Sequence, residues 1–123
     1  MPIRSVVGGG GAKAQGKVRV LCWTNRAGRK PVKDWIGQLD DQSFRKVDKL
    51  LGLLREMGRE LRPPHCRFLG EGLYELRDTN AGPGYRVYYI WQGNLLIILL
   101  AAGDKGSQWQ DIEVARRRME EQE

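Results

Sequence analysis

The sequence predicts an α+β fold in which a small, mainly antiparallel sheet of four strands carries helices on one face. Three strand-like runs, residues 73–77, 84–91 and 95–102, follow one another with only turns between them. Two segments, residues 41–57 and 108–121, carry apolar side chains at helical spacing. Consecutive strands joined by short turns form hairpins, and amphipathic helices must bury their apolar sides against such a sheet.

Composition predicts one folded domain that binds an acidic partner. The chain has 123 residues, of which 41% are hydrophobic and 29% charged, so wholesale disorder is excluded. Its formal charge of +6 favours a polyanionic or acidic partner. Charge alone does not choose between RNA, DNA, a membrane surface and an acidic protein.

The first 16 residues predict a flexible glycine-rich tail, and residues 17–123 a single domain. The run GGGGAK lacks the preceding strand and the hydroxyl residue of a phosphate-binding loop. No window holds the roughly 18 apolar residues of a membrane span, and no secretory signal is evident. With only Cys22 and Cys66 present, we expect reduced structural thiols and a cytoplasmic location.

The first half of the domain predicts one strand and two helices. Residues 18–24 are rich in β-formers and are followed by a turn. Pro31 suits the first turn of a short helix over residues 31–39. The next helix begins at Asp41 and ends before Gly58 and the Pro63-Pro64 pair. Its apolar stripe consists of Phe44, Val47, Leu50, Leu51, Leu54 and Met57.

The second half predicts a loop, three strands and a helix. His65 and Cys66 lie in the predicted loop, and His65 has no second histidine with which to form a metal site. Residues 95–102 are all apolar, which predicts a central strand covered on both faces. The first strand returns through helices and should run parallel to a neighbour. The last helix should turn Trp109, Ile112, Ala115, Met119 and the Arg116 stem toward the sheet.

Strand alternation predicts a cationic sheet face. Leu76 and Val87 should point to one side of the sheet, and Arg77, Arg86 and Tyr88 to the other. Because arginine is rarely buried without a partner, we expect this second face to stay partly open, where it would suit phosphate. The alternative is an ordinary solvated face on which the arginines pair with Glu75 or Asp78, Tyr88 packs rather than stacks, and Lys105 is a simple loop lysine.

The order and spacing of four motifs carry a family resemblance. They are LYELR at residues 73–77, GYRVY at 84–88, GDK at 103–105, and a final helix with QDI at 110–112 and AR at 115–116. Over residues 17–121, the chain resembles the RelE/HigB-like toxins of type II toxin-antitoxin systems, particularly the phage-derived addiction-module killer proteins.

The resemblance implies an endoribonuclease that cuts messenger RNA on the ribosome, needs no metal or other cofactor, and is neutralised by a small helix-turn-helix antitoxin. In such enzymes the ribose 2′-hydroxyl attacks the adjacent phosphorus and leaves a 2′,3′-cyclic phosphate. Arg77 and Arg86 would clamp the scissile phosphate, and Lys105 would add charge and assist proton transfer. Tyr88 would stack on a base or orient the 2′-hydroxyl. Arg116 and Arg117 would bind RNA.

This chain departs from many relatives after the central strand, where they carry a lysine pair. Here Asp104 precedes Lys105 and Gly106 follows it, so one positive charge is missing and the general base is left open. Two other functions fit the same charge pattern. One is a toxin of the same fold that poisons a target such as DNA gyrase by binding alone, and the other is a basic RNA-binding domain without enzymatic activity.

Overall fold

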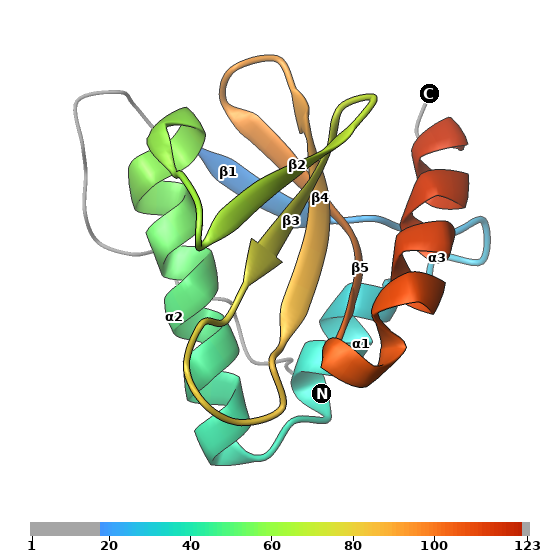
Figure 1. Ribbon diagram of the computed structural model, residues 1–123. Helices are drawn as coiled ribbons and strands as arrows, with labels where there is room; N and C mark the ends of the chain where they lie inside the picture. The colour runs from blue at the N-terminus through green and yellow to red at the C-terminus, as the bar shows by residue number, and fades with distance from the viewer. Residues whose placement is uncertain (1–17, 122–123) are drawn as a thin grey trace.

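The structure, a computed structural model, describes residues 18–121, so the predicted tail at 1–16 lies outside the described residues. Five strands and three α-helices, with two short 3-10 turns, follow one another as shown in Figure 1. In chain order they are β1 Arg19–Cys22, α1 Pro31–Gly37, α2 Asp41–Met57, η1 Gly58–Glu60, β2 Cys66–Gly70, β3 Leu73–Arg77, β4 Arg86–Gln92, β5 Leu96–Gly103, η2 Lys105–Ser107 and α3 Gln108–Glu120.

The strands form a single mixed sheet in the order β1-β5-β4-β3-β2. The last three strands are antiparallel and β1 runs parallel to β5, both as predicted. The prediction of four strands was wrong, because β2 forms where a loop was expected and pairs with β3. A tight turn joins them: Gly70, Glu71 and Gly72 all have positive φ, a conformation that glycine adopts at little cost.

Helices cover both faces of the sheet, which corrects the prediction of helices on one face. The helices α1 and α2 pack against the face that carries Leu76, Val87 and Tyr89. On the opposite face, α3 packs through Ala115 against Tyr88 and other residues of β4 and β5. Figure 1 shows α2 and α3 on opposite sides of the strands. The second face is therefore covered by α3 where β4 and β5 pack against it, and it is not the open face that was expected.

The longest helix, α2, forms where the apolar stripe predicted it. Asp40 caps its start, since its carboxylate accepts a hydrogen bond of 2.7 Å from the Ser43 amide. Val47, Leu51 and Leu54 are fully buried in the core between α2 and the sheet. Each such leucine contributes about 1.5–3 kcal/mol by leaving water. None of the helices in the described part of the chain is long and apolar enough to cross a membrane.

The helix α3 begins after η2, where Asp104 and Ser107 form a capping box. Ala115 is fully buried, and Ile112 and Met119 pack beside it as predicted. The prediction for Trp109 was wrong, because this side chain is 80% exposed. Gln108 faces the sheet, where its side chain donates a hydrogen bond to Glu75. Because successive residues of an α-helix are rotated by about 100°, the next side chain points in a different direction. Trp109 therefore projects from the flank of α3 instead of from its buried side.

Candidate functional site

The register of two strands places a pair of arginines at the candidate site. Arg77, the last residue of β3, lies directly opposite Arg86, the first residue of β4. Alternation along the strands directs Leu76 and Val87 into the core under α2, so the two arginines lie on the α3 side. The shared face expected for Arg77 and Arg86 is thus present.

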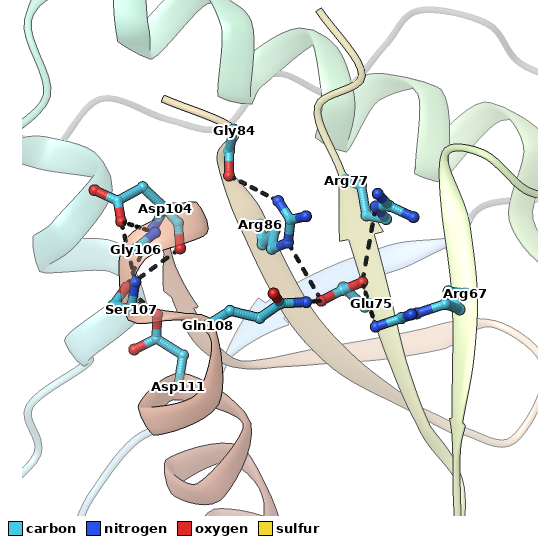
Figure 2. Close-up of polar contacts among 10 residues, drawn as sticks. All are labelled: Arg67, Glu75, Arg77, Gly84, Arg86, Asp104, Gly106, Ser107, Gln108 and Asp111. Carbon is cyan, nitrogen blue, oxygen red and sulfur yellow. Dashed lines mark hydrogen bonds and ion pairs between the residues drawn. The ribbon is translucent and has the colours of Figure 1, made fainter. Parts of the chain in front are cut away.

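A buried carboxylate holds these arginines in place. Glu75 is fully buried, and its two oxygens face three guanidinium groups and one amide (Figure 2). Arg67 approaches Oε1 at 3.3 Å and Arg77 at 3.9 Å, while the Arg86 Nε lies 3.5 Å from Oε2. Gln108 of α3 donates a hydrogen bond of 2.9 Å to Oε2. We call Arg67, Arg77 and Arg86 around Glu75 the arginine cluster.

The arginine cluster keeps positive charge that no carboxylate of the described residues neutralises. Three guanidinium groups face the single carboxylate of Glu75. The Nε atoms of Arg77 and Arg86 are buried and form no hydrogen bond to described protein atoms, although both lie within ion-pair distance of Glu75. Buried donors in that state are uncommon in folded proteins, and a role in ligand binding or catalysis is one reason for them. The cluster can therefore bind an anion through its outward nitrogens.

The two central arginines differ in exposure. The Arg86 side chain is 8% exposed, and its Nη1 donates a hydrogen bond of 3.0 Å to the Gly84 carbonyl. The Arg77 side chain is 35% exposed. The expectation of two open arginines is thus corrected for Arg86, because α3 covers this part of the face and Glu75 compensates the buried charge. Arg86 is preorganised, whereas Arg77 is accessible.

Lys105 approaches the arginine cluster at Gly84. A Cβ placed on Gly84 would lie 3.2 Å from the Lys105 Cβ and 3.4 Å from the Arg86 Nη1, so glycine permits the close approach of these two cationic side chains. The Lys105 amide also donates a hydrogen bond of 3.1 Å to the Pro83 carbonyl. Lys105 itself is exposed. The strands β3 and β4 and the turn after β5 thus bring three cationic residues to one margin of the sheet.

Asp104 does not face the arginine cluster. Its Oδ1 accepts hydrogen bonds from the amides of Gly106 at 2.8 Å and Ser107 at 3.2 Å. Its carboxylate therefore caps the turn that carries Lys105 (Figure 2). Asp104, which immediately precedes Lys105 in the sequence, thus fixes the backbone on which Lys105 stands.

Tyr88 occupies the core, which corrects the expectation that it lies on an open face. Its side chain is fully buried against α3 and offers no ring face to a base. Burial, and next the negative charge of Glu75, raise the pKa of Tyr88 well above its ordinary value. Tyr88 therefore stays protonated at neutral pH and packs beneath the Glu75 carboxylate.

The arginines of α3 mostly bind the protein's own backbone. The Nη2 of Arg116 donates a hydrogen bond of 2.8 Å to the Leu69 carbonyl, and its Nη1 lies 3.4 Å from Glu71. The Arg116 guanidinium thus fastens the turn between β2 and β3, and its contact with RNA stays a prediction. Arg117 is exposed. Arg118 donates to the Leu100 carbonyl at 2.7 Å, and burial lowers the pKa of Arg118.

A groove of about 830 Å³ opens on the other side of the sheet end. The outer side of α2 lines it together with His65, Asp78 and Asn80. Three cationic and three acidic residues line this groove, whereas the arginine cluster holds excess positive charge. We therefore place an anionic substrate at the cluster. No three His, Cys, Asp or Glu side chains within residues 18–121 come together in a way that could hold a metal ion.

Sequence reasoning missed Glu75, Arg67 and Gln108 as site residues. Glu75 lies two positions before Arg77, so alternation does place both on one face. Arg67 could have been found only by recognising β2, whose strand-turn-strand pattern CRFLGEGLYEL is visible in the sequence. Gln108 carries no local signal, since its role depends on where α3 docks.

Comparison with known proteins identifies a family. Residues 34–120 match the family described as phage derived protein Gp49-like (DUF891), a range that includes the whole arginine cluster. An uncharacterized protein of Haemophilus influenzae (strain ATCC 51907 / DSM 11121 / KW20 / Rd) is 46% identical over 48 residues, which are 39% of this chain and 48% of that protein. The chain thus spans about half the length of this curated relative.

Proposed function

The chain belongs to the phage-derived Gp49-like protein family, and from this premise we propose that it is the toxin of a toxin-antitoxin system and cuts messenger RNA. The family is toxin-like, which is consistent with such a role. The finer assignment, to a RelE/HigB-like endoribonuclease acting on the ribosome, is supported by the convergence of Arg77, Arg86 and Lys105 from three segments. This convergence is the observation that carries the proposal.

The proposed reaction is transesterification within RNA. The ribose 2′-oxygen forms a bond to the adjacent phosphorus while the bond from phosphorus to the 5′-oxygen breaks. The 2′-hydroxyl gives up its proton to solvent water, and the leaving 5′-oxygen gains one from Lys105, which solvent then reprotonates. The phosphorane between these steps carries two negative charges. Donors that are already in place stabilise such charge at little reorganisation cost, which is what a preorganised Arg86 offers.

Each cationic side chain has a part in this proposal. Arg77 is exposed enough to contact the scissile phosphate with its planar fork. Arg86, held by Glu75 and Gly84, directs positive charge at the same phosphate from beneath. Lys105 supplies a third charge and protonates the 5′-oxygen. Glu75 acts as a positioning residue, because its buried carboxylate lies within ion-pair distance of all three guanidinium groups and accepts a hydrogen bond from Gln108.

The test compares the intact protein with Arg77→Ala. Induced expression of the intact protein should arrest growth, and primer extension should find new 5′ ends on cellular messages. Arg77→Ala should remove both effects. Arg26→Ala is the matched control, since it removes one exposed positive charge on the loop after β1 and should change neither. Purified protein should leave 2′,3′-cyclic phosphate on RNA, with ribosomes added if free RNA is not cut.

Other outcomes would favour another function. Growth arrest with intact messages and damaged DNA would support a toxin that poisons a target such as gyrase by binding. If the intact protein binds RNA but neither arrests growth nor cuts any message, the RNA-binding domain without enzymatic activity is supported. A neighbouring gene for a short helix-turn-helix protein would supply the proposed antitoxin, whose coexpression should restore growth.

A further inference from the structure

Trp109 is an indole that the fold does not use for packing. It is 80% exposed, whereas Trp23 is 8% exposed and both Trp35 and Trp91 pack against the α2 core. The other large exposed apolar side chains of the described residues, Leu21, Phe68 and Leu95, belong to β1, β2 and the turn before β5. Among the described residues, Trp109 is therefore the one large exposed apolar side chain on α3.

The position of Trp109 brings it to the edge of the arginine cluster. The preceding residue, Gln108, donates its hydrogen bond to Glu75. Arg116 follows Trp109 by seven residues, about two helical turns, so the two side chains leave α3 on the same side. Arg116 reaches the Leu69 carbonyl of β2, which shows that this side of α3 faces β2. Trp109 thus flanks the arginine cluster on its β2 side.

Arg67 supplies charge on the same flank. It lies on β2, ion-pairs with Glu75 at 3.3 Å, and its side chain is 49% exposed. An exposed indole on the side of α3 that faces β2, together with a half-exposed guanidinium on β2, offers a flat stacking surface and a phosphate contact. Proteins that bind single-stranded nucleic acid use this combination, because every base has a face that stacks on an aromatic ring. Lys105 and Gly84 lie at the opposite end of the Arg77–Arg86 pair.

We propose that Trp109 and Arg67 form a subsite for an unpaired nucleotide next to the scissile phosphate, with the base stacked on the indole. The inference rests on the proposed function, since it takes the Arg77–Arg86 pair as the phosphate site. A purine covers more of the indole than a pyrimidine, so the subsite prefers a purine. A protein partner is disfavoured, because a docking helix or strand would need further apolar neighbours around Trp109.

The experiment measures binding without cleavage. Fluorescently labelled 2′-O-methyl RNA hexamers cannot be cut, since their 2′-oxygens carry no proton, and their anisotropy reports affinity. Hexa-adenylate, hexa-uridylate and an abasic hexamer are titrated with intact protein, Trp109→Ala, Trp109→Phe and Phe68→Ala. Phe68 is the matched control, because it is 57% exposed but contacts Tyr74 on the opposite face. Cleavage of unmodified RNA is measured in parallel.

We expect Trp109→Ala to weaken hexa-adenylate binding about 10-fold or more, and Trp109→Phe to stay within about threefold of the intact protein. Phe68→Ala should bind hexa-adenylate with the affinity of the intact protein. The abasic hexamer should bind Trp109→Ala and the intact protein with equal affinity. Hexa-adenylate should bind more tightly than hexa-uridylate. Unchanged affinity in Trp109→Ala, or an equal loss on the abasic hexamer, overturns the subsite.

The two proposals fail separately. If the intact protein cuts RNA while Trp109→Ala binds and cuts equally well, the subsite is wrong and the nuclease stands. If binding depends on Trp109 but no RNA is cut, with or without ribosomes, the subsite stands and the nuclease is wrong. If the intact protein neither binds the hexamers nor cuts RNA, both are wrong.

Discussion

The Glu75 carboxylate fixes the Arg86 guanidinium from the neighbouring strand, with Arg86 Nε 3.5 Å from Glu75 Oε2 and both side chains buried. Arg86 is thereby aligned before any substrate arrives. The arrangement makes stability and the candidate site depend on the same carboxylate, because removing it would leave a buried guanidinium without compensation.

Glu75→Ala should destabilise the protein by about 3 kcal/mol, because it leaves the buried Arg86 charge unpaired. The loss is measured by urea denaturation, as a lower midpoint concentration with an unchanged m-value. Glu71→Ala is the control, since the Glu71 side chain is 84% exposed and its pair with Arg116 should contribute less than about 1 kcal/mol. Equal losses in the two variants would contradict a special role for Glu75.

Gly84→Ala should lower RNA cleavage more than it lowers stability. Gly84 has φ +70°, so any side chain strains the backbone, and the added methyl would also press on Lys105 and Arg86 at 3.2 and 3.4 Å. Gly93→Ala is a close control, because Gly93 has φ +71° and no atom within 4 Å of the added Cβ. Both variants should lose about 1 kcal/mol of stability, but only Gly84→Ala should lose activity. Similar activity in both would show that the spacing at Gly84 is irrelevant.

Arg86→Lys should reduce cleavage about 100-fold or more while the protein stays folded. Lysine keeps the charge but cannot contact Glu75, the Gly84 carbonyl and a phosphate oxygen with one planar fork. Single-turnover rates with saturating RNA measure the effect. Arg29→Lys, on the exposed loop before α1, should leave the rate unchanged. Near-wild-type turnover of Arg86→Lys would reduce Arg86 to a simple source of charge.

Lys105→Ala should reduce the salt dependence of RNA binding. If Lys105 contacts one phosphate, the slope of log affinity against log salt should fall in magnitude by about 0.7 for single-stranded RNA. Anisotropy titrations at several salt concentrations give the slope. A variant with lower affinity but an unchanged slope would place Lys105 away from the phosphates.

The two cysteine thiols should react slowly in the native protein at neutral pH. Burial raises the pKa of Cys22 and of Cys66, so at a given pH less thiolate is present than in a free thiol. The native reaction with a disulfide reagent should therefore continue to accelerate above about pH 8.5, where the reaction of a free thiol levels off. Urea-unfolded protein supplies the reference rate, and a native rate at pH 7 equal to that reference would contradict this assignment.

The elements that the sequence predicted well are those whose pattern is local. The stripe of α2 and the apolar run of β5 show their burial within one segment, and β1 was recognised with its parallel pairing. The missed features depend on partners distant in sequence. Trp109 was taken for core because Ile112 and Ala115 follow it, and only the docked helix shows that Gln108 takes the inner position.

The cationic face was predicted in part for the same reason. Alternation correctly separated Arg77 and Arg86 from Leu76 and Val87. It could not show that α3 would cover Tyr88, or that Glu75 would be buried at the centre of the arginines. Both outcomes depend on α3, which covers this face of the sheet. The position in which α3 docks cannot be predicted from any single segment of the sequence.

Side chains along α3 fasten it to the sheet: Gln108 bonds to Glu75, Arg116 to the Leu69 carbonyl and Arg118 to the Leu100 carbonyl. Detachment of this helix would uncover Tyr88 and release one support of the Glu75 carboxylate in the same event. Undocking α3 would therefore switch off the candidate site even while the α2 core stayed folded.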